Sequence, residues 1–135
     1  MIETLIDTNI AIHLRDGEPD VSRRIAALDR LPCLSIASRI ELENGVYRDP
    51  AMTPIIRSRL ALMVDQMTTL PFDGAALLAY RAIVAARGYA RSRVFDRMIA
   101  AHALSIDATL ITINGSDFRD VPGLRLEIWP SPDGG

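Results

Sequence analysis

Residues 5–10 read LIDTNI, and this stretch brings an apolar segment directly to a carboxylate, Asp7. The longer segment 1–7, MIETLID, has the length and the apolar character of a short buried strand. Asp7 would then stand where the strand ends. Two interpretations are open at this point: Asp7 caps a helix that follows, or it forms one wall of an acidic pocket.

Apolar segments of strand length alternate with segments of helical periodicity along the chain. The expected strands cover residues 1–7, 32–36, 68–72, 108–112 and 124–129. The expected helices cover residues 8–17, 20–31, 38–48, 53–67, 74–88 and 96–106. Alternation of this kind is typical of a parallel sheet with helices on both faces. We therefore predict an α/β protein with three α/β/α layers around a small, mainly parallel sheet.

Capping residues mark the ends of two of these helices. Asp20 is the expected N-cap of the second helix, and Asp73 is that of the helix that Gly88 closes. One face of the helix at 74–88 is expected to pack closely against a neighbour, because its residues are mostly small. That face comprises Ala75, Leu78, Ala79, Ala82, Ile83 and Ala86.

Length and composition indicate one domain. The chain has 135 residues, of which 49% are hydrophobic, enough for a single core. We expect one domain over residues 1–135 with a flexible tail at 131–135. The uncharged runs are too short to cross a bilayer, and the N-terminus lacks the basic region of a secretory signal, so we expect a cytoplasmic protein without membrane contact. Cys33 is the only cysteine, which excludes an internal disulfide and a multi-cysteine zinc site.

Positive charge is concentrated in one segment of a mildly acidic chain. The formal net charge is −2, and all 15 basic residues are arginine. Five of them fall at Arg81, Arg87, Arg91, Arg93 and Arg97. Because guanidinium groups pair well with phosphate oxygens, this run is a candidate surface for an anionic ligand. An arginine-rich composition combined with a solvated helix face would explain the same run.

Four carboxylates fall at strand ends or helix starts. Asp7 ends the first strand, Glu41 lies one turn into a helix, Asp96 opens another helix, and Asp117 follows the fourth strand. Each has an ordinary interpretation alone, as a cap, a surface charge or a turn residue, and Glu43 competes with Glu41. Ligands bind outside the carboxyl ends of parallel strands, so we expect these four side chains to share one pocket.

Such a pocket favours a cation, because carboxylates at close range raise one another's pKa values. Hard oxygen ligands without clustered Cys or His favour Mg²⁺ or Mn²⁺, and phosphodiester hydrolysis is the reaction that such an ion suits. Asn9, Thr112 and Asn114 are candidates for orienting the carboxylates or a water, although Asn114 is also a plausible turn residue. His102, which lies on another face of the Asp96 helix, is interpreted as a packing or surface residue.

The segments LIDTNI, SIASRIELENG, FDRMIAAHAL, ATLITINGSDF and VPGLRLEIW, in this order, span nearly the whole chain. Together they resemble the PIN-domain proteins, and specifically the VapC-type toxin ribonucleases of type II toxin–antitoxin pairs. The resemblance implies an endoribonuclease dependent on Mg²⁺ or Mn²⁺, a homodimer, and an antitoxin whose tail blocks the acidic groove. The implied catalytic residues are Asp7, Glu41, Asp96 and Asp117.

Within that set, Asp7, Asp96 and Asp117 match the metal ligands of the family, and Glu41 matches the carboxylate that helps to activate water. The RNA phosphates would meet Arg91, Arg93 and Arg97. Arg97 departs from the family pattern, because many relatives carry an apolar or small residue after the acid at position 96.

Other enzyme classes fit this sequence less well. A haloacid-dehalogenase-like phosphatase needs a second Asp where this chain has Asn9, and a receiver domain or a P-loop needs a lysine, which the chain lacks. A catalytically silent PIN-fold module that binds RNA or regulates a partner stays open.

Overall fold

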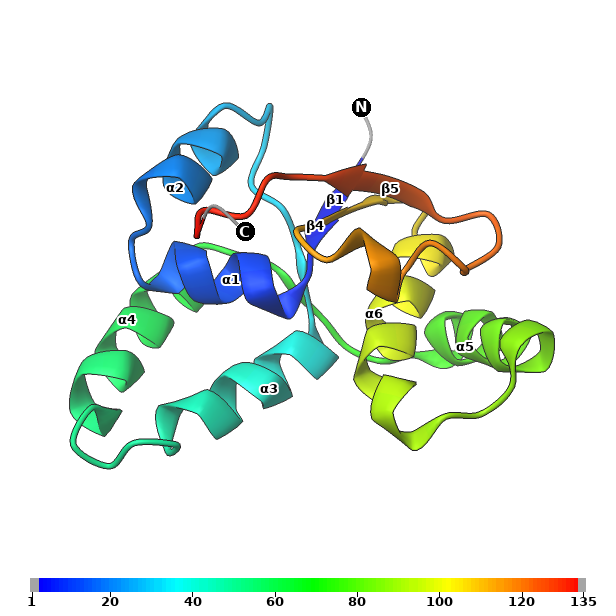
Figure 1. The fold of residues 1–135 in the computed structure, drawn as a ribbon, viewed down its shortest axis with the longest axis horizontal. Coiled ribbons are helices and arrows are strands. Elements are labelled where there is room, and N and C mark those ends of the chain that lie inside the picture. The colour runs from blue at the N-terminus through cyan, green and yellow to red at the C-terminus, as the bar shows by residue number, and fades with distance from the viewer. Residues whose placement is uncertain (1–2, 134–135) are drawn as a thin grey trace.

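The computed structural model describes residues 3–133, and short parallel strands run through its centre (Figure 1). The strands are β1 (Thr4–Ile6), β2 (Leu34–Ser35), β3 (Thr69–Leu70), β4 (Thr109–Thr112) and β5 (Arg125–Ile128). β4 pairs with β1 on one side and β5 on the other, and β2 pairs with β3. A parallel bridge from Leu5 to Cys33 joins the two sheets, which gives the order β3-β2-β1-β4-β5. Residues 1, 2, 134 and 135, including part of the expected tail, lie outside the described residues.

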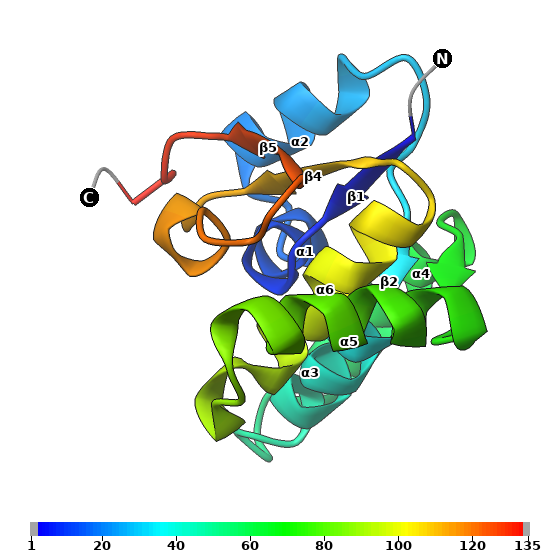
Figure 2. The same ribbon diagram turned by 90° about the vertical axis from the view of Figure 1, so that its right-hand side faces the viewer.

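Helices cover both faces of these strands, as predicted. They are α1 (Thr8–Arg15), α2 (Pro19–Ala26), α3 (Ile36–Val46), α4 (Thr53–Asp65), α5 (Gly74–Arg87) and α6 (Val94–Ser105). Figures 1 and 2 show α5 and α6 on one side of the strands and α1 and α2 on the other. Neighbouring residues of a strand point to opposite faces, so Leu5 packs in the cluster with α5 and α6 while Ile6 packs in the cluster with α1, α2 and α4. The three-layer α/β/α prediction is confirmed.

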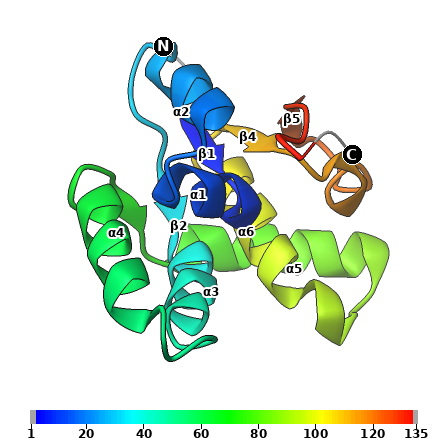
Figure 3. The ribbon, with the colours of Figure 1, turned by 60° about the vertical axis from the view of Figure 1, so that its left-hand side comes forward.

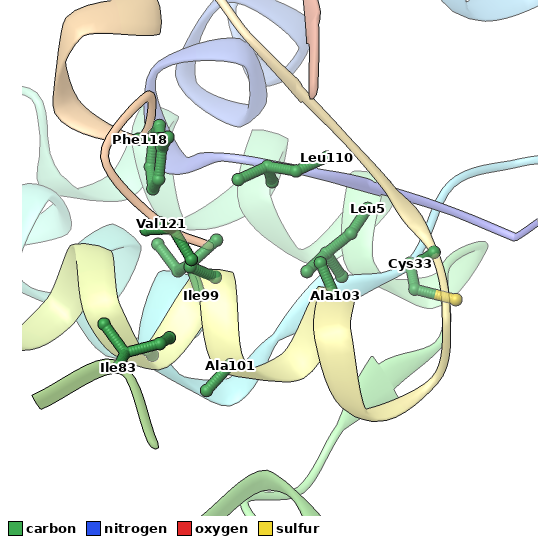
Figure 4. Packing of buried hydrophobic residues seen from close by; sticks show 12 residues of the cluster. Leu5, Cys33, Ile83, Ile99, Ala101, Ala103, Leu110, Phe118 and Val121 are labelled. Atoms are coloured by element: carbon green, nitrogen blue, oxygen red, sulfur yellow. The ribbon is translucent and has the colours of Figure 1, made fainter. Parts of the chain in front are cut away.

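The core beside α6 is built from aliphatic strand residues and small helix residues (Figure 4). Leu5 and Leu110 are fully buried against α6, where Ile99 and Ala103 meet them. Alanines at this position of the helix allow its backbone to approach the strands closely. The sheet and α6 therefore hold a fixed relative position, which matters because both carry predicted site residues.

The predicted packing face of α5 is confirmed at Ala79 and Ile83 and is wrong at its other four positions. The helix buries Ala76 and Ile83 against α6, whereas Ala75, Leu78 and Ala82 are exposed. Small and apolar residues occur on both sides of this helix, so two overlapping periodic series fit the sequence and only packing selects between them.

Two helix starts were predicted from capping residues, with different outcomes. Asp73 caps α5 by accepting a hydrogen bond from Ala76 N–H at 2.9 Å, as expected. The cap of α2 is Glu18, whose carboxylate accepts from Val21 N–H at 2.7 Å, and Asp20 lies instead in the first turn. Pro19 explains the difference, because its fixed φ suits the first helical position and moves the cap back to the preceding residue.

The carboxyl ends of β1, β2 and β4 open toward the same edge, where α1 and α3 begin. Figure 3 shows α3 and α4 side by side next to α1 at this edge. The first turn of α6 and the 3-10 helix η2 (Gly115–Asp117) complete it. None of the helices described between residues 3 and 133 has the length and apolarity that crossing a bilayer requires.

Candidate functional site

An acidic pocket of about 210 Å³ lies at the carboxyl edge of the strands. Asp7, Glu41, Asp96 and Asp117 all line it, so the four carboxylates singled out in the sequence come together from four separate elements. The rest of the wall consists of Thr8, Asn9, Ile12 and Arg48. The parallel topology explains this convergence, because it brings the loops after β1, β2 and β4 to one edge.

Asp7 is both a helix cap and a pocket wall, so the two interpretations of this residue hold together. Its side chain is 4% exposed, and Oδ1 accepts a hydrogen bond from Ile10 N–H at 3.0 Å at the start of α1. Oδ2 accepts a hydrogen bond from the buried Thr112 hydroxyl. Burial raises the pKa of Asp7, and the nearby charges of Asp117 and Glu41 raise it further, while the two hydrogen bonds oppose the shift.

Glu41 is oriented by hydroxyl groups that the sequence analysis did not identify. Thr8 Oγ1 donates to Glu41 Oε1 at 2.5 Å and lies 3.1 Å from the buried Ser38 Oγ. Sequence spacing could have suggested both residues, because Thr8 follows Asp7 directly and Ser38 precedes Glu41 by one helical turn.

Glu43, the competitor of Glu41, lies outside this pocket. Its carboxylate makes a two-pronged ion pair with Arg57 of α4, with N–O distances of 2.7 and 2.8 Å. The hydrogen bonds from Arg57 lower the pKa of Glu43, so it stays ionised as a surface ion-pair partner. The geometry therefore separates the two glutamates that the motif alone left in competition.

Asp96 carries the clearest sign of crowded negative charge. It lies in the first turn of α6, and burial raises the pKa of this carboxyl to about 6. The charges of Asp117, Glu41 and Asp7 contribute to the shift in that order, and Arg93 opposes it. The protein groups around Asp96 therefore do not fully offset the negative charge of the pocket.

The predicted supporting residues act in different ways. Thr112 is fully buried and donates to Asp7, and its oxygen also accepts from Asn114 N–H at 2.9 Å. Asn114 thus supports the site through its backbone, while its side chain is exposed. Asn9 is exposed on the pocket wall, where its amide can reach a ligand.

The chemistry of the pocket fits a hard divalent cation, although the carboxylates do not surround one point closely enough to form a complete metal site. Within residues 3–133, no three acidic, His or Cys side chains stand close enough to enclose an ion. Asp7 and Glu41 accept hydrogen bonds from protein donors, which hold them in place. The available metal ligands are carboxylate oxygens, which Mg²⁺ and Mn²⁺ prefer, and burial together with the neighbouring negative charges raises the pKa of Asp96, an environment in which a cation would favour the ionised form.

The arginine run divides into exposed and buried members. Arg97 is only 7% exposed and forms two hydrogen bonds with the Asp120 carboxylate, at 2.8 and 2.9 Å. The predicted contact of Arg97 with RNA phosphates finds no support here, because its guanidinium is buried and already paired. Arg91 is exposed on the 3-10 helix η1 (Arg91–Arg93), and Arg93 Nη1 donates to the Asp117 carbonyl at 3.2 Å.

His102 is a packing residue, as interpreted from the sequence, and it links two helices of the site. The ring is 2% exposed, with Nδ1 2.7 Å from Ser35 Oγ and Nε2 3.0 Å from the Pro71 carbonyl. Burial lowers the pKa of His102, which favours the neutral ring. Ser35 caps α3, so His102 fixes the start of the Glu41 helix against the Asp96 helix.

Comparison with known proteins agrees with this geometry. The sequence matches the PIN domain over residues 4–124. The tRNA(fMet)-specific endonuclease VapC of Shigella flexneri is 31% identical, and the match covers 96% of this chain and 99% of the relative. Ribonuclease VapC2 of Rickettsia felis is 27% identical, with 93% and 96% covered.

Solved structures give the same result. The DNA-bound VapBC complex of Salmonella typhimurium matches with a TM-score of 0.81 at 26% identity, covering 96% of this chain and 99% of the matched chain. The promoter-bound VapBC2 complex of Rickettsia felis, at 24% identity, shows the same fold with a TM-score of 0.83, covering 95% and 99%. The chain therefore belongs to the PIN-domain family, within its group of VapC-type toxins.

Proposed function

We propose that this protein is a divalent-metal-dependent endoribonuclease and the toxin of a toxin–antitoxin pair. The observation that carries the proposal is the meeting of Asp7, Glu41, Asp96 and Asp117 in one pocket. The ribonuclease names of the VapC relatives support an RNA substrate. We also propose that residues 1–135 form one PIN domain and that the protein cleaves RNA in the cytoplasm.

In this mechanism the carboxylates divide the work according to their surroundings. Asp7, Asp96 and Asp117 would hold Mg²⁺ or Mn²⁺, with Asp7 aimed by Thr112. When bound, such an ion lowers the pKa of a coordinated water and offsets negative charge at the phosphate. Glu41, oriented by the Thr8 hydroxyl, would take the proton of the attacking water as general base.

The test is cleavage of defined RNAs by purified, partner-free protein. Initiator tRNA and a structured control RNA are incubated with Mg²⁺ or Mn²⁺ and the wild type, Asp7→Asn, Asp96→Asn or Glu43→Gln. We expect cleavage by the wild type and Glu43→Gln, and none by the two Asp variants. Equal cleavage by all four proteins would reveal a contaminating nuclease and remove support for the proposal. RNA binding without cleavage by the wild type would favour the catalytically silent module.

We further propose that a small antitoxin encoded beside this chain inhibits it, and that the chain forms homodimers. The matched structures are VapBC complexes, which supports an antitoxin partner. An apolar groove of about 300 Å³ between α1, α2 and α4, which includes Ile25, Leu62 and Met63, suits an amphipathic segment of such a partner. The exposed Leu77 and Leu78 of α5 suit contact with a second copy.

Two measurements test these partners separately. Leu62 is 72% exposed, so Leu62→Asp should keep the fold and RNA cleavage while it prevents co-purification with the product of the adjacent reading frame. Unchanged co-purification would place the antitoxin elsewhere. Light scattering of the isolated protein measures the dimer, and a monomer at micromolar concentration would refute it.

A further inference from the structure

A second groove lies beside the acidic pocket. Its volume is about 260 Å³, and it lies among α1, α3 and α4, which Figure 3 shows grouped together. Ile12, Glu41 and Arg48 line both the groove and the acidic pocket, so the two spaces are neighbours. A chain-like ligand that lies over the carboxylates can therefore extend to this groove.

Arg48 is the arginine between the groove and the acidic pocket that can bind a ligand. It follows α3, is exposed, and belongs to none of the ion pairs formed among residues 3–133. The other arginine of the groove, Arg15, is bound by the Asp16 carboxylate at 2.9 Å, and its side chain is only 9% exposed. Arg15 is therefore part of the wall, whereas Arg48 can reach an incoming anion.

The walls beyond Arg48 are apolar. They are formed by Ile12, Leu42, Met52 and Ile56. Met52 keeps 38% of its surface exposed, and Asp49, which also lines the groove, accepts a hydrogen bond from Ala51 N–H at 3.1 Å. A guanidinium at the entrance of an apolar groove matches one nucleotide, because the phosphate is anionic and the base has flat apolar faces.

We propose that this groove holds the nucleobase next to the cleaved phosphodiester, and that Arg48 holds the phosphate of that nucleotide. The inference rests on the proposed nuclease function and adds a subsite to it. Arg48 then fixes the register of the RNA over the carboxylates, and Met52 contributes to the choice of base. Neither residue belongs to the acidic quartet that would carry the reaction.

The phosphate contact is tested by RNA binding without metal. A fluorescein-labelled single-stranded RNA of mixed sequence is titrated in EDTA against the wild type, Arg48→Ala, Arg48→Lys and Arg23→Ala. Arg23 is a matched control, because it is an exposed arginine on α2 away from both pockets. We expect Arg48→Ala to weaken binding several-fold and to reduce the slope of log affinity against log salt by about 0.7. Arg48→Lys should keep the slope, and a wild-type slope in Arg48→Ala would overturn the proposal.

The base contact is tested by methyl NMR of the intact protein. Nucleoside 5′-monophosphates and ribose 5-phosphate are titrated separately, with the methyl group of Met52 as the reporter. We expect the nucleotides to shift this signal and ribose 5-phosphate, which lacks a base, to leave it unchanged. Met52→Ala should weaken nucleotide binding without a change in the salt slope. Equal shifts with both probes, or none, would overturn the base subsite.

These readouts do not depend on cleavage, so the two proposals can fail separately. If wild type never cleaves RNA but Arg48→Ala lowers the salt slope and nucleotides shift Met52, the nuclease function fails while the nucleotide subsite stands. If wild type cleaves RNA and Arg48→Ala binds and cleaves like it, the subsite fails. Loss of antitoxin binding alone in Arg48→Ala would assign the groove to the protein partner and also overturn the inference.

Discussion

Replacing Asp96 with Asn should stabilise the metal-free protein at pH 8. Asp96 is partly buried in the first turn of α6, and its pKa of about 6 lies well above the ordinary value of 3.8. If the whole shift in the pKa of Asp96 acted on stability, keeping this carboxyl ionised in the folded protein would cost about 3 kcal/mol. Solvent screening of a partly exposed carboxylate reduces this to roughly 1–2 kcal/mol. Asparagine has nearly the same shape and carries no charge, so it removes that cost.

The effect should depend on pH in a defined direction. Between about pH 4 and pH 6 the folded protein binds more protons at Asp96 than the unfolded chain does, so the contribution of Asp96 to the stability of the metal-free wild type falls as pH rises through this window. Asp96→Asn should remove that part of the fall. The difference between variant and wild type should therefore be small near pH 4 and reach its full value above pH 7.

Urea unfolding in EDTA at pH 4.5 and pH 8 measures this difference, with Asp29→Asn as the control. Asp29 is an exposed carboxylate on the loop after α2, where removal of one charge should change stability little. The reasoning is refuted if Asp96→Asn lowers the unfolding free energy at pH 8 by 1 kcal/mol or more, on the order of a helix-dipole interaction. Asp96 would then serve chiefly as a favourable charge at the start of α6.

Three further predictions follow from the contacts of the site and its surroundings. Thr112→Val removes the hydroxyl donor to Asp7, so isothermal titration should show at least about 10-fold weaker Mn²⁺ binding; unchanged affinity would mean that Thr112 does not orient the carboxylate. Arg97→Ala breaks the partly buried ion pair with Asp120 and should lower the unfolding free energy by about 2 kcal/mol without changing the salt slope of RNA binding. Glu43→Gln should cleave RNA at the wild-type rate, since Glu43 lies outside the acidic pocket. A large loss of kcat would make Glu43 again a candidate for the catalytic role assigned to Glu41.

Much of the fold could be predicted from the sequence because strand and helix periodicities alternate clearly. The segment 5–10 marks the end of β1 and the start of α1, and Asp73 marks the start of α5. The register of α5 could not be predicted, since Ala75 and Ala76 fit overlapping series equally well. Such a choice depends on the surface of α6, which local sequence does not describe.

The acidic pocket could be expected from topology, whereas its polar surroundings could not. Parallel strands bring their carboxyl ends to one edge, so residues far apart in sequence, such as Asp7 and Asp117, were expected to meet there. Pairings such as Arg97 with Asp120 depend on side-chain directions across different elements. Arg48 was missed for a related reason: it lies outside the motifs, and only the folded α3 brings it to the pocket.

The four carboxylates do not depend equally on a cation. Asp7 already accepts two hydrogen bonds that oppose its raised pKa, and Glu41 accepts one from Thr8. The pKa of Asp96 instead reflects burial and three like charges, with only the charge of Arg93 in opposition. A divalent ion would therefore relieve Asp96, and the fall in the contribution of Asp96 to stability between about pH 4 and pH 6 should flatten when Mg²⁺ is present. Asp96 thus weakens the metal-free fold at neutral pH and is a site at which metal binding would stabilise it, which couples the fold of this chain to the proposed chemistry.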